Sequence, residues 1–547
     1  MKNQQHFYSN QYVHLGIIMI VSVFSFFINN QIIPADLMES RNLATAQEMV
    51  KYGNYLLPTM NGEPRLEKPP LPTWIAAAIE HVAPHNLVIQ RYAAGIAATL
   101  LVIFLYLFVS RLTRNNRTGL IASLILATSF NIILMGRTAT WDIYTHCFML
   151  GAIYFITIAF EEKGAQWKYF LLTGLFTGLS FLSKGPVSLY ALFLPFLISY
   201  IIVYRPSLKE KKAALAGMIL LAVIVSCWWY GYTYLFHQDF AVDIAEKESS
   251  SWLNHNVRPL YYYWKFAAEA GIWALFWITA IVYFFMNKQT IYQKEYKFAF
   301  IWFLSSLILL SIIPEKKTRY LLPLLVPGAM LMGFYIYQMI IGIKTKSEKI
   351  LFRINAIIIS IILIALPIAL YILFYKENQL SLAILIIATI CSWSLCGFIL
   401  WSIFGKKGIL VTNVFSAIIL TMMMVTGICL IPIGSMFINE QRHSIRLVTE
   451  NDKAQGLPLY HDKDEFLRME LVYEVSQRIN ALDLSDEAAI RKATPFVLIS
   501  GESADSIMAN KNVTVEYIDT YDNNWRKPDH KRHNDELVRQ AAIIRAK

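Results

Sequence analysis

The sequence predicts an α-helical membrane protein with many spans, helices in its outer loops and a small soluble α/β domain at its C-terminal end. Three observations predict this fold class. Of the 547 residues, 56% are hydrophobic and 16% are charged, whereas a soluble protein has roughly 25% charged residues. The apolar residues also form runs of roughly 20, the length that a helix needs to cross a bilayer. After residue 437 these runs stop and the chain becomes polar.

The apolar runs predict about thirteen spanning helices. They cover residues 15–33, 92–111, 118–136, 143–160, 169–184, 186–204, 213–236, 267–287, 297–313, 319–341, 351–375, 379–403 and 409–436. The fifth and sixth runs are separated only by Lys184-Gly185-Pro186.

The loops between these runs alternate in charge. The short loops at 111–117, 163–168, 205–212, 288–297, 344–349 and 406–407 are basic. The positive-inside rule places them in the cytoplasm, together with the N-terminus. The loops 34–91 and 237–266 then face the outside, which is the periplasm if the chain lies in a bacterial inner membrane. Because the net charge of +11 arises mainly from the short loops, it does not indicate a nucleic-acid partner.

Two domains are expected. Residues 1–437 form the membrane domain with both outer loops, and residues 438–547 form a periplasmic α/β domain. Strand-like runs occur at 457–460, 495–500 and 513–518, with helical patterns at 464–482 and 485–493. The last stretch, 534–547, is interpreted as an amphipathic helix or a tail. This domain shows no phosphate loop, metal cluster or nucleophile elbow in its sequence.

The first outer loop gathers acids, bases and prolines at the membrane surface. Residues 34–72 read PADLMESRNLATAQEMVKYGNYLLPTMNGEPRLEKPPLP. Residues 36–52 carry an apolar stripe that predicts a helix, and Gly53 would end it. Asp36 and Glu39, three residues apart, share one helix face. Each carboxylate is either part of a solvated face or a general base that takes a proton from a hydroxyl. The pair Glu67-Lys68 is either a surface ion pair or part of a phosphate site.

Other outer segments offer further groups with the same two interpretations. Asp142 starts a span in GRTATWD, where it could be a simple helix cap, and Lys184 in LSKGP could be a lysine that reaches the interface. The turn PEKKTRY puts cations on the outer side, against the positive-inside trend, which favours a bound anion such as a lipid phosphate. The loop 237–266 holds His255 and a run of aromatic residues suited to the headgroup level.

These segments resemble a known family, the bacterial GT-C glycosyltransferases related to the protein O-mannosyltransferases and the lipid A aminoarabinose transferases. The first loop matches the family pattern at Glu39-Ser40-Arg41, Gly53-Asn54-Tyr55, Asn61-Gly62-Glu63-Pro64 and Glu67-Lys68-Pro69-Pro70-Leu71. The segments GRTATWD, LSKGP and KKTRYLLPLLVP match further on. The Glu-Lys-Pro-Pro match is the specific one.

The resemblance implies a GT-C fold and an enzyme, a hexosyl- or pentosyltransferase. Its donor would be a polyprenyl-phosphate-linked sugar, and its acceptor a hydroxyl of lipid A, another glycolipid, a glycan or a protein on the outer face. The expected partners are this donor, the acceptor and membrane lipids, with no nucleic acid. A divalent metal, Zn²⁺ or Mg²⁺/Mn²⁺, is the one cofactor implied, near Glu67 and His255.

The resemblance also suggests roles for single residues. We expect the donor phosphate to be bound by a set of cations and one phenol: Arg41, Lys68, Lys184, Lys317 and Tyr320. Two adjacent acids open the family's loop and the first is its favoured base, but Met38 stands at that position here. Glu39 is therefore the expected base, Asp142 its alternative or partner, and Asp36 a further candidate.

Two rival functions come from other classes. A transporter or flippase of lipid-linked sugars predicts ionisable residues in mid-span and paired repeats. The chain instead gathers its charges at one membrane face. A structural or assembly subunit predicts that residues 440–547 are essential and that Glu39 is not.

Overall fold

The computed structural model describes residues 10–254, 256–287, 290–406, 408–437 and 439–547. The chain forms two compact units. The helical unit comprises residues 1–30, 67–72 and 91–432, and the sheet unit comprises residues 31–66, 73–90 and 433–547. In this division most of the first outer loop clusters with the C-terminal residues, whereas the sequence analysis assigned that loop to the membrane domain.

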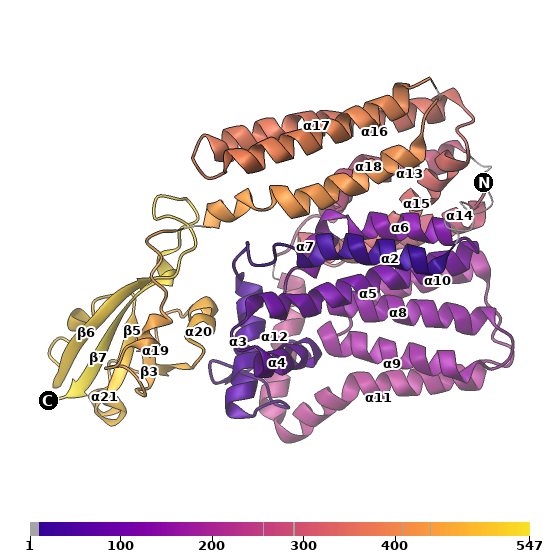
Figure 1. Cartoon of the computed structure of the whole chain (residues 1–547). Coiled ribbons are helices and arrows are strands. Elements are labelled where there is room, and N and C mark those ends of the chain that lie inside the picture. Colours follow the sequence, from indigo (N-terminus) through magenta and orange to yellow (C-terminus); the bar gives the residue numbers. More distant parts are fainter. Residues whose placement is uncertain (1–9, 255, 288–289, 407, 438) are drawn as a thin grey trace. The chain divides into compact units, whose positions relative to one another are not determined.

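The helical unit is a bundle of long helices (Figure 1). They are α2 (Gln11–Ser22), η1 (Val23–Phe27), α5 (Leu87–Thr113), α6 (Asn116–Ala127), α7 (Phe130–Gly136), α8 (Asp142–Glu161), α9 (Trp167–Lys184), η2 (Leu189–Phe193), α10 (Leu194–Tyr204), α11 (Lys212–Phe236), α12 (Gln238–Asn254), η3 (Leu260–Trp273), α13 (Ala274–Met286), α14 (Gln293–Ile312), η4 (Thr318–Leu324), α15 (Leu325–Ile341), α16 (Lys346–Leu370), η5 (Tyr371–Tyr375), α17 (Leu382–Phe404), α18 (Val411–Met424) and η6 (Val425–Cys429). Helix α9 packs against both α8 and α11, and α16 packs against α17.

The helical unit is that of a multi-pass membrane protein. Within the described residues, nine helices are long and apolar enough to cross a membrane, or ten if α6 and α7, which meet at 69°, form one span. Each predicted run overlaps a helix, but the count of thirteen is not confirmed. Residues Gln11–Phe27 and Leu189–Tyr204 form shorter apolar helices. Helix α9 is 18 residues long and carries lysines near both ends, which lowers its hydropathy.

The contacts at one end of the bundle agree with the prediction that successive loops lie on alternating sides of the membrane. Arg111 at the end of α5 pairs with Glu161 and Glu162 at the end of α8, each at 2.6 Å. The Nζ of Lys211, just before α11, donates to the carbonyl of Glu162 at 2.6 Å. Three of the short basic loops therefore meet at the same end of the helical unit.

The sheet unit is built around five strands in the order β4-β3-β5-β7-β6. Its strands are β3 (Leu459–Asp462), β4 (Ile479–Leu482), β5 (Phe496–Ser500), β6 (Val513–Asp522) and β7 (Val538–Ala546). Strand β3 runs parallel to β4 and β5, whereas β7 is antiparallel to β5 and β6. Short helices accompany the sheet: η7 (Pro432–Phe437), α19 (Leu447–Glu450), α20 (Met469–Val475), α21 (Glu487–Ala493), α22 (Ala504–Ile507) and η8 (Asp535–Leu537).

Two predictions about this region were wrong. The last stretch is neither a helix nor a tail, because Val538–Ala546 is a strand between β5 and β6. Its residues Ala541 to Ile544 are all buried, so the strand is covered on both faces and shows no alternation in its sequence. The predicted helix 464–482 is also shorter, since α20 ends at Val475 and Ile479–Leu482 forms the edge strand β4.

The first outer loop contributes two helices and a small hairpin to the structure. The predicted helix is confirmed as α3 (Leu37–Tyr52), and Gly53 ends it in the left-handed conformation with φ 74°. The hairpin pairs β1 (Thr59–Met60) with β2 (Glu63–Pro64), and helix α4 (Leu71–Val82) follows. Helices α3, α4 and α12 lie in the outer loops, where the sequence predicted helices in general but located only α3.

Candidate functional site

A buried ion pair joins the start of α8 to the end of α9. The Nζ of Lys184, the last residue of α9, donates to Oδ1 of Asp142, the first residue of α8. The two side chains are only 7% and 3% exposed. Because α8 and α9 are consecutive and pack along each other, the end of one meets the start of the other. The sequence predicted both residues as site residues but not their contact.

Gly185 makes this junction possible. It follows Lys184 with φ 70° and ψ −152°, a backbone region that only glycine adopts readily. Helix α9 can therefore end abruptly at Lys184 and the chain can turn into Pro186. The Lys-Gly-Pro motif is thus a structural device that leaves the lysine at the very end of its helix.

A second group of charges lies on the segment before η4. The Nζ of Lys317 pairs with Oε1 of Glu315 at 2.5 Å, and the phenol of Tyr320 donates to the same oxygen at 3.2 Å. Lys316 has a structural role, since its Nζ donates to the carbonyls of Arg258 and Ile313 at 3.0 and 2.6 Å. Burial lowers the pKa of Lys316.

Tyr320 connects the two groups. The Nζ of Lys184 lies 5.2 Å from the centre of its ring, and the Nζ of Lys317 lies 5.8 Å from it. Arg319 acts electrostatically on both Asp142 and Lys184, and Lys68 acts on Lys184. We call this set the Asp142–Lys184 cluster: Lys68, Asp142, Lys184, Glu315, Lys317, Arg319 and Tyr320.

The cluster suits a phosphate group. Its two ion pairs are neutral, and Arg319 adds a positive charge whose Nε has no hydrogen-bond partner among the described residues. Lysine and arginine are the usual protein ligands of phosphate, and they act most strongly where water is excluded. Four of the five residues predicted to bind the phosphate belong to the cluster. Arg41 is the fifth, and it lies in the sheet unit.

Two further residues join this region without having been predicted as site residues. Arg319 stands between Lys317 and Tyr320 in the sequence, so its position was the available signal. His146 follows Asp142 by one helical turn and acts on it electrostatically. The i,i+4 spacing of Asp142 and His146 on a helix was the signal for the second residue.

The predicted acids of the first outer loop lie on α3. Asp36 is its N-cap, and its carboxylate accepts hydrogen bonds from the backbone N–H groups of Met38 and Glu39, both at 2.8 Å. Its structural role is therefore evident. Glu39 lies in the first turn and is 1% exposed. The carbonyl of Arg41 accepts a hydrogen bond from Arg65 at 2.7 Å, while the Nε of Arg41 has no such partner within the described residues.

The predicted metal site is only partly described. Oε2 of Glu67 is buried and has no hydrogen-bond partner in the described part of the chain, which fits a carboxylate that could bind a cation. His255 lies outside the described residues. Over those that are described, no group of three His, Cys, Asp or Glu side chains could hold a metal.

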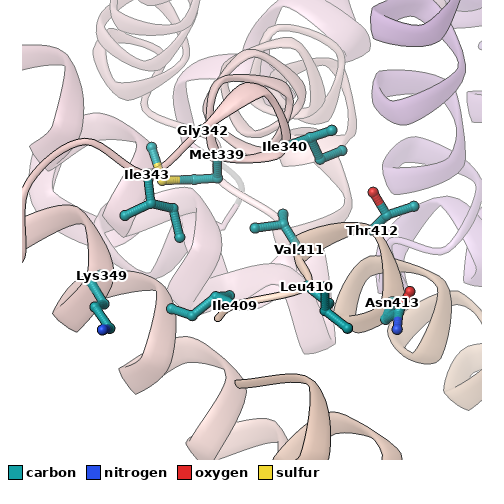
Figure 2. A pocket seen from close by; sticks show the side chains of 10 residues that line it. All are labelled: Met339, Ile340, Gly342, Ile343, Lys349, Ile409, Leu410, Val411, Thr412 and Asn413. Carbon is teal, nitrogen blue, oxygen red and sulfur yellow. The ribbon is translucent and has the colours of Figure 1, made fainter. Parts of the chain in front are cut away.

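A cavity of about 480 Å³ lies elsewhere in the helical unit. Figure 2 shows its lining, which comes from the end of α15, the start of α16 and the start of α18, and includes Lys349. The cluster residues Lys317, Arg319 and Tyr320 lie just before the N-terminal end of α15, and the cavity lies at its C-terminal end. This helix of 17 residues is roughly 25 Å long. The cavity is therefore remote from the cluster and does not belong to the same site.

Comparison with known proteins is consistent with this geometry. The family profile "Dolichyl-phosphate-mannose-protein mannosyltransferase" matches residues 67–230, which include Lys68, Asp142 and Lys184. An uncharacterized protein of Aquifex aeolicus is 26% identical over 287 residues, 52% of this chain and 56% of its own length. The undecaprenyl phosphate-alpha-4-amino-4-deoxy-L-arabinose arabinosyl transferase of Yersinia enterocolitica is 23% identical over 390 residues, 66% of each chain. The chain thus spans between about half and two thirds of the length of these relatives.

Two solved structures share the fold over nearly the whole chain. ArnT from Cupriavidus metallidurans bound to undecaprenyl phosphate matches with a TM-score of 0.71 and 13% identity, covering 97% of both chains. Its apo form matches with a TM-score of 0.68 over the same share. The resemblance stated from the sequence is confirmed by these matches. The chain is thus similar to the protein mannosyltransferases over residues 67–230 and to the aminoarabinose transferases over about two thirds of its length, and it shares the fold of ArnT.

Proposed function

We propose that the chain transfers a sugar from a polyprenyl-phosphate donor to a hydroxyl group on the outer face of a bacterial inner membrane. The observation that carries the proposal is the Asp142–Lys184 cluster at the end of the bundle opposite the basic loops. Helix α8 connects the two ends, with Asp142 at its start and Glu161, the partner of Arg111, at its end. Its 20 residues span roughly 30 Å, the thickness of the bilayer core.

The comparisons support the same donor. One relative is named as an undecaprenyl phosphate aminoarabinose transferase, and the ArnT structure has undecaprenyl phosphate bound. The acceptor in this proposal is a hydroxyl of lipid A, another glycolipid, a glycan or a protein. The N-terminus then lies in the cytoplasm and the sheet unit in the periplasm, as the basic loops predict.

The proposed reaction needs one cationic site and one base. The acceptor oxygen attacks the anomeric carbon of the donor sugar and forms the new glycosidic bond. The bond between that carbon and the phosphate oxygen breaks, and its electron pair leaves with the polyprenyl phosphate. Lys184, Lys317 and Arg319 stabilise the negative charge that grows on the phosphate. The family resemblance adds Lys68 and Arg41 as further phosphate ligands.

The acceptor proton passes to a carboxylate. Glu39 is the proposed base, because Asp142 is already engaged by Lys184 and serves to hold that lysine. Asp142 is the alternative base. A divalent metal, bound at Glu67 with His255, would add positive charge near the phosphate.

The experiment that tests this function compares cells that have or lack the gene. Mass spectrometry of their lipid A, glycolipids, glycans and glycoproteins should show that one sugar modification is missing without the gene. Expression of the wild-type chain or of the Lys349→Met variant should restore it, because Lys349 lies at the opposite end. The Lys184→Met variant should not restore it. Unchanged lipids, glycans and glycoproteins in the absence of the gene would contradict the proposal.

A further inference from the structure

The sheet unit contains a connection between the first outer loop and the C-terminal residues. Helix α3 packs against α20, and Ala44 of α3 belongs to the same apolar core as Leu471 and Val475. One face of α3 is therefore part of the core of the C-terminal domain. Glu39 lies on this helix, so whatever orients α3 also orients Glu39.

A buried carboxylate lies at the centre of the connection. Glu48 of α3, whose side chain is 4% exposed, accepts hydrogen bonds from the guanidinium of Arg478 at 3.1 and 3.2 Å. The hydroxyl of Thr59 donates to the same carboxylate at 2.6 Å, and the backbone N–H of Gly62 donates at 3.2 Å. The guanidinium also lies 4.0 Å from the ring centre of Tyr52, one helical turn after Glu48.

The hairpin of the first loop makes a second connection. Its turn is Asn61-Gly62, with φ 55° and 86°, as in the left-handed two-residue turns that favour Asn-Gly. The side chain of Asn61 donates to the carbonyl of Ile479 at 2.7 Å and accepts from the N–H of Ile479 at 2.8 Å. Ile479 begins β4, the edge strand of the sheet, so the amide of Asn61 pairs with this edge as a strand would.

These contacts form one device, which we call the loop clip: Glu48, Thr59, Asn61, Gly62, Arg478 and Ile479. The Glu48 carboxylate has donors from the loop and from the C-terminal domain, so neither part satisfies it alone. A buried carboxylate that loses one donor is destabilised, which makes the connection cooperative. Part of the family-like segment Asn61-Gly62-Glu63-Pro64 therefore contacts the C-terminal domain.

We infer that the C-terminal domain is a positioning element that fixes α3, and with it Glu39, through the loop clip. This inference rests on the proposed function for its link to catalysis. Glu48 follows Glu39 by nine residues on one continuous helix, about 13 Å along its axis. Holding the helix at Glu48 fixes the direction of its first turn. Misplacing a catalytic group by about 1 Å can lower a rate by about 100-fold.

The test uses two arginines of the same kind. Arg478→Gln breaks the clip, whereas Arg442→Gln removes a matched arginine whose partners, Glu474 and Trp525, both lie in the C-terminal domain. Arg442 pairs with Glu474 at 2.9 Å and lies 3.8 Å from the ring centre of Trp525. Both variants remove an ion pair and a cation–π contact from the sheet unit. Arg478→Lys keeps the positive charge but loses the planar guanidinium with its fixed N–H donors, so its effects on exchange and kcat should be intermediate.

Two readouts separate positioning from folding. Amide hydrogen exchange of α3 should become at least about tenfold faster in Arg478→Gln, while β5 and β7 stay protected. In Arg442→Gln the exchange of α3 should stay as in the wild type. In a transfer assay, Arg478→Gln should lower kcat by about 100-fold and change the donor KM by less than about threefold.

The outcomes distinguish this inference from the proposed function. Wild-type exchange of α3 in Arg478→Gln would overturn the inference, whatever the activity. Faster exchange of α3 without a fall in kcat would overturn the positioning role. Faster exchange confined to Arg478→Gln, in a chain whose wild type transfers no sugar, would support the clip and contradict the proposed function.

Discussion

Replacing Lys184 by methionine should weaken both the protein and its donor binding. The change leaves the Asp142 carboxylate buried at 3% exposure without its cation. Removing one member of a buried ion pair costs about 3–5 kcal/mol of stability. If Lys184 also contacts the donor phosphate, a lost charge-assisted hydrogen bond costs about 1.5–3 kcal/mol. The donor dissociation constant should then rise about 10- to 140-fold, at 1.4 kcal/mol per factor of ten.

A double variant separates the two effects. In Lys184→Met combined with Asp142→Leu, neither charge of the pair remains, so no unpaired carboxylate is left and most of the lost stability should return. Donor binding should stay weak, because the cation is still absent. Thermal unfolding of the purified protein measures the first effect, and titration with undecaprenyl phosphate measures the second. Wild-type donor affinity in Lys184→Met, with Lys349→Met as the control, would refute the phosphate role. A double variant as unstable as the single one would refute the ion-pair argument.

Three further predictions concern other parts of the chain. Glu39→Gln should lower kcat about 10²- to 10⁴-fold with donor binding unchanged. Glu63→Gln, which alters an exposed acid of the same loop, should leave kcat unchanged. Equal kcat values for the two variants in transfer assays would exclude Glu39 as the base. Gly185→Ala should lower the free energy of unfolding by about 1–3 kcal/mol, because an alanine would be strained at φ 70° and ψ −152°. Unchanged stability in thermal unfolding would contradict the special role of this junction. Burial lowers the pKa of His461 below its usual 6.5, so the unfolded chain binds more protons and the sheet unit should lose stability as the pH falls below about 6.5. His461→Gln should flatten this dependence in unfolding measured from about pH 7 to pH 5, and an equal slope in both proteins would contradict it.

Local features of the structure were predictable from the sequence. The apolar stripe and Gly53 correctly predicted α3, and the apolar runs predicted where helices occur in the bundle. Charge at the ends of runs pointed to Asp142, Lys184 and Lys317, and the family resemblance pointed to Tyr320; the fold brings all four together. These predictions succeed because helix periodicity, helix ends and the charge of the loops that flank a span are all encoded over a few residues.

Contacts between distant residues could not be predicted from one sequence. Glu48 and Arg478 are 430 residues apart, so nothing local indicates that they meet. Strand β7 was interpreted as a helix or tail because burial on both faces removes the alternation typical of a strand. The role of Asp36 depended on the position at which α3 begins, since a shift of one residue exchanges a cap for a side chain of the first turn.

The most direct test of the central claim is the release of polyprenyl phosphate by the purified chain. The protein is reconstituted in lipid vesicles with undecaprenyl-phosphate-linked sugars and a membrane extract that supplies acceptors. Mass spectrometry then follows free undecaprenyl phosphate and new glycosides. The account predicts that both appear together with the wild-type chain and that neither appears with the Lys184→Met variant. Movement of intact donor across the bilayer, without release of the phosphate carrier by any wild-type sample, would contradict a transferase and favour a transporter.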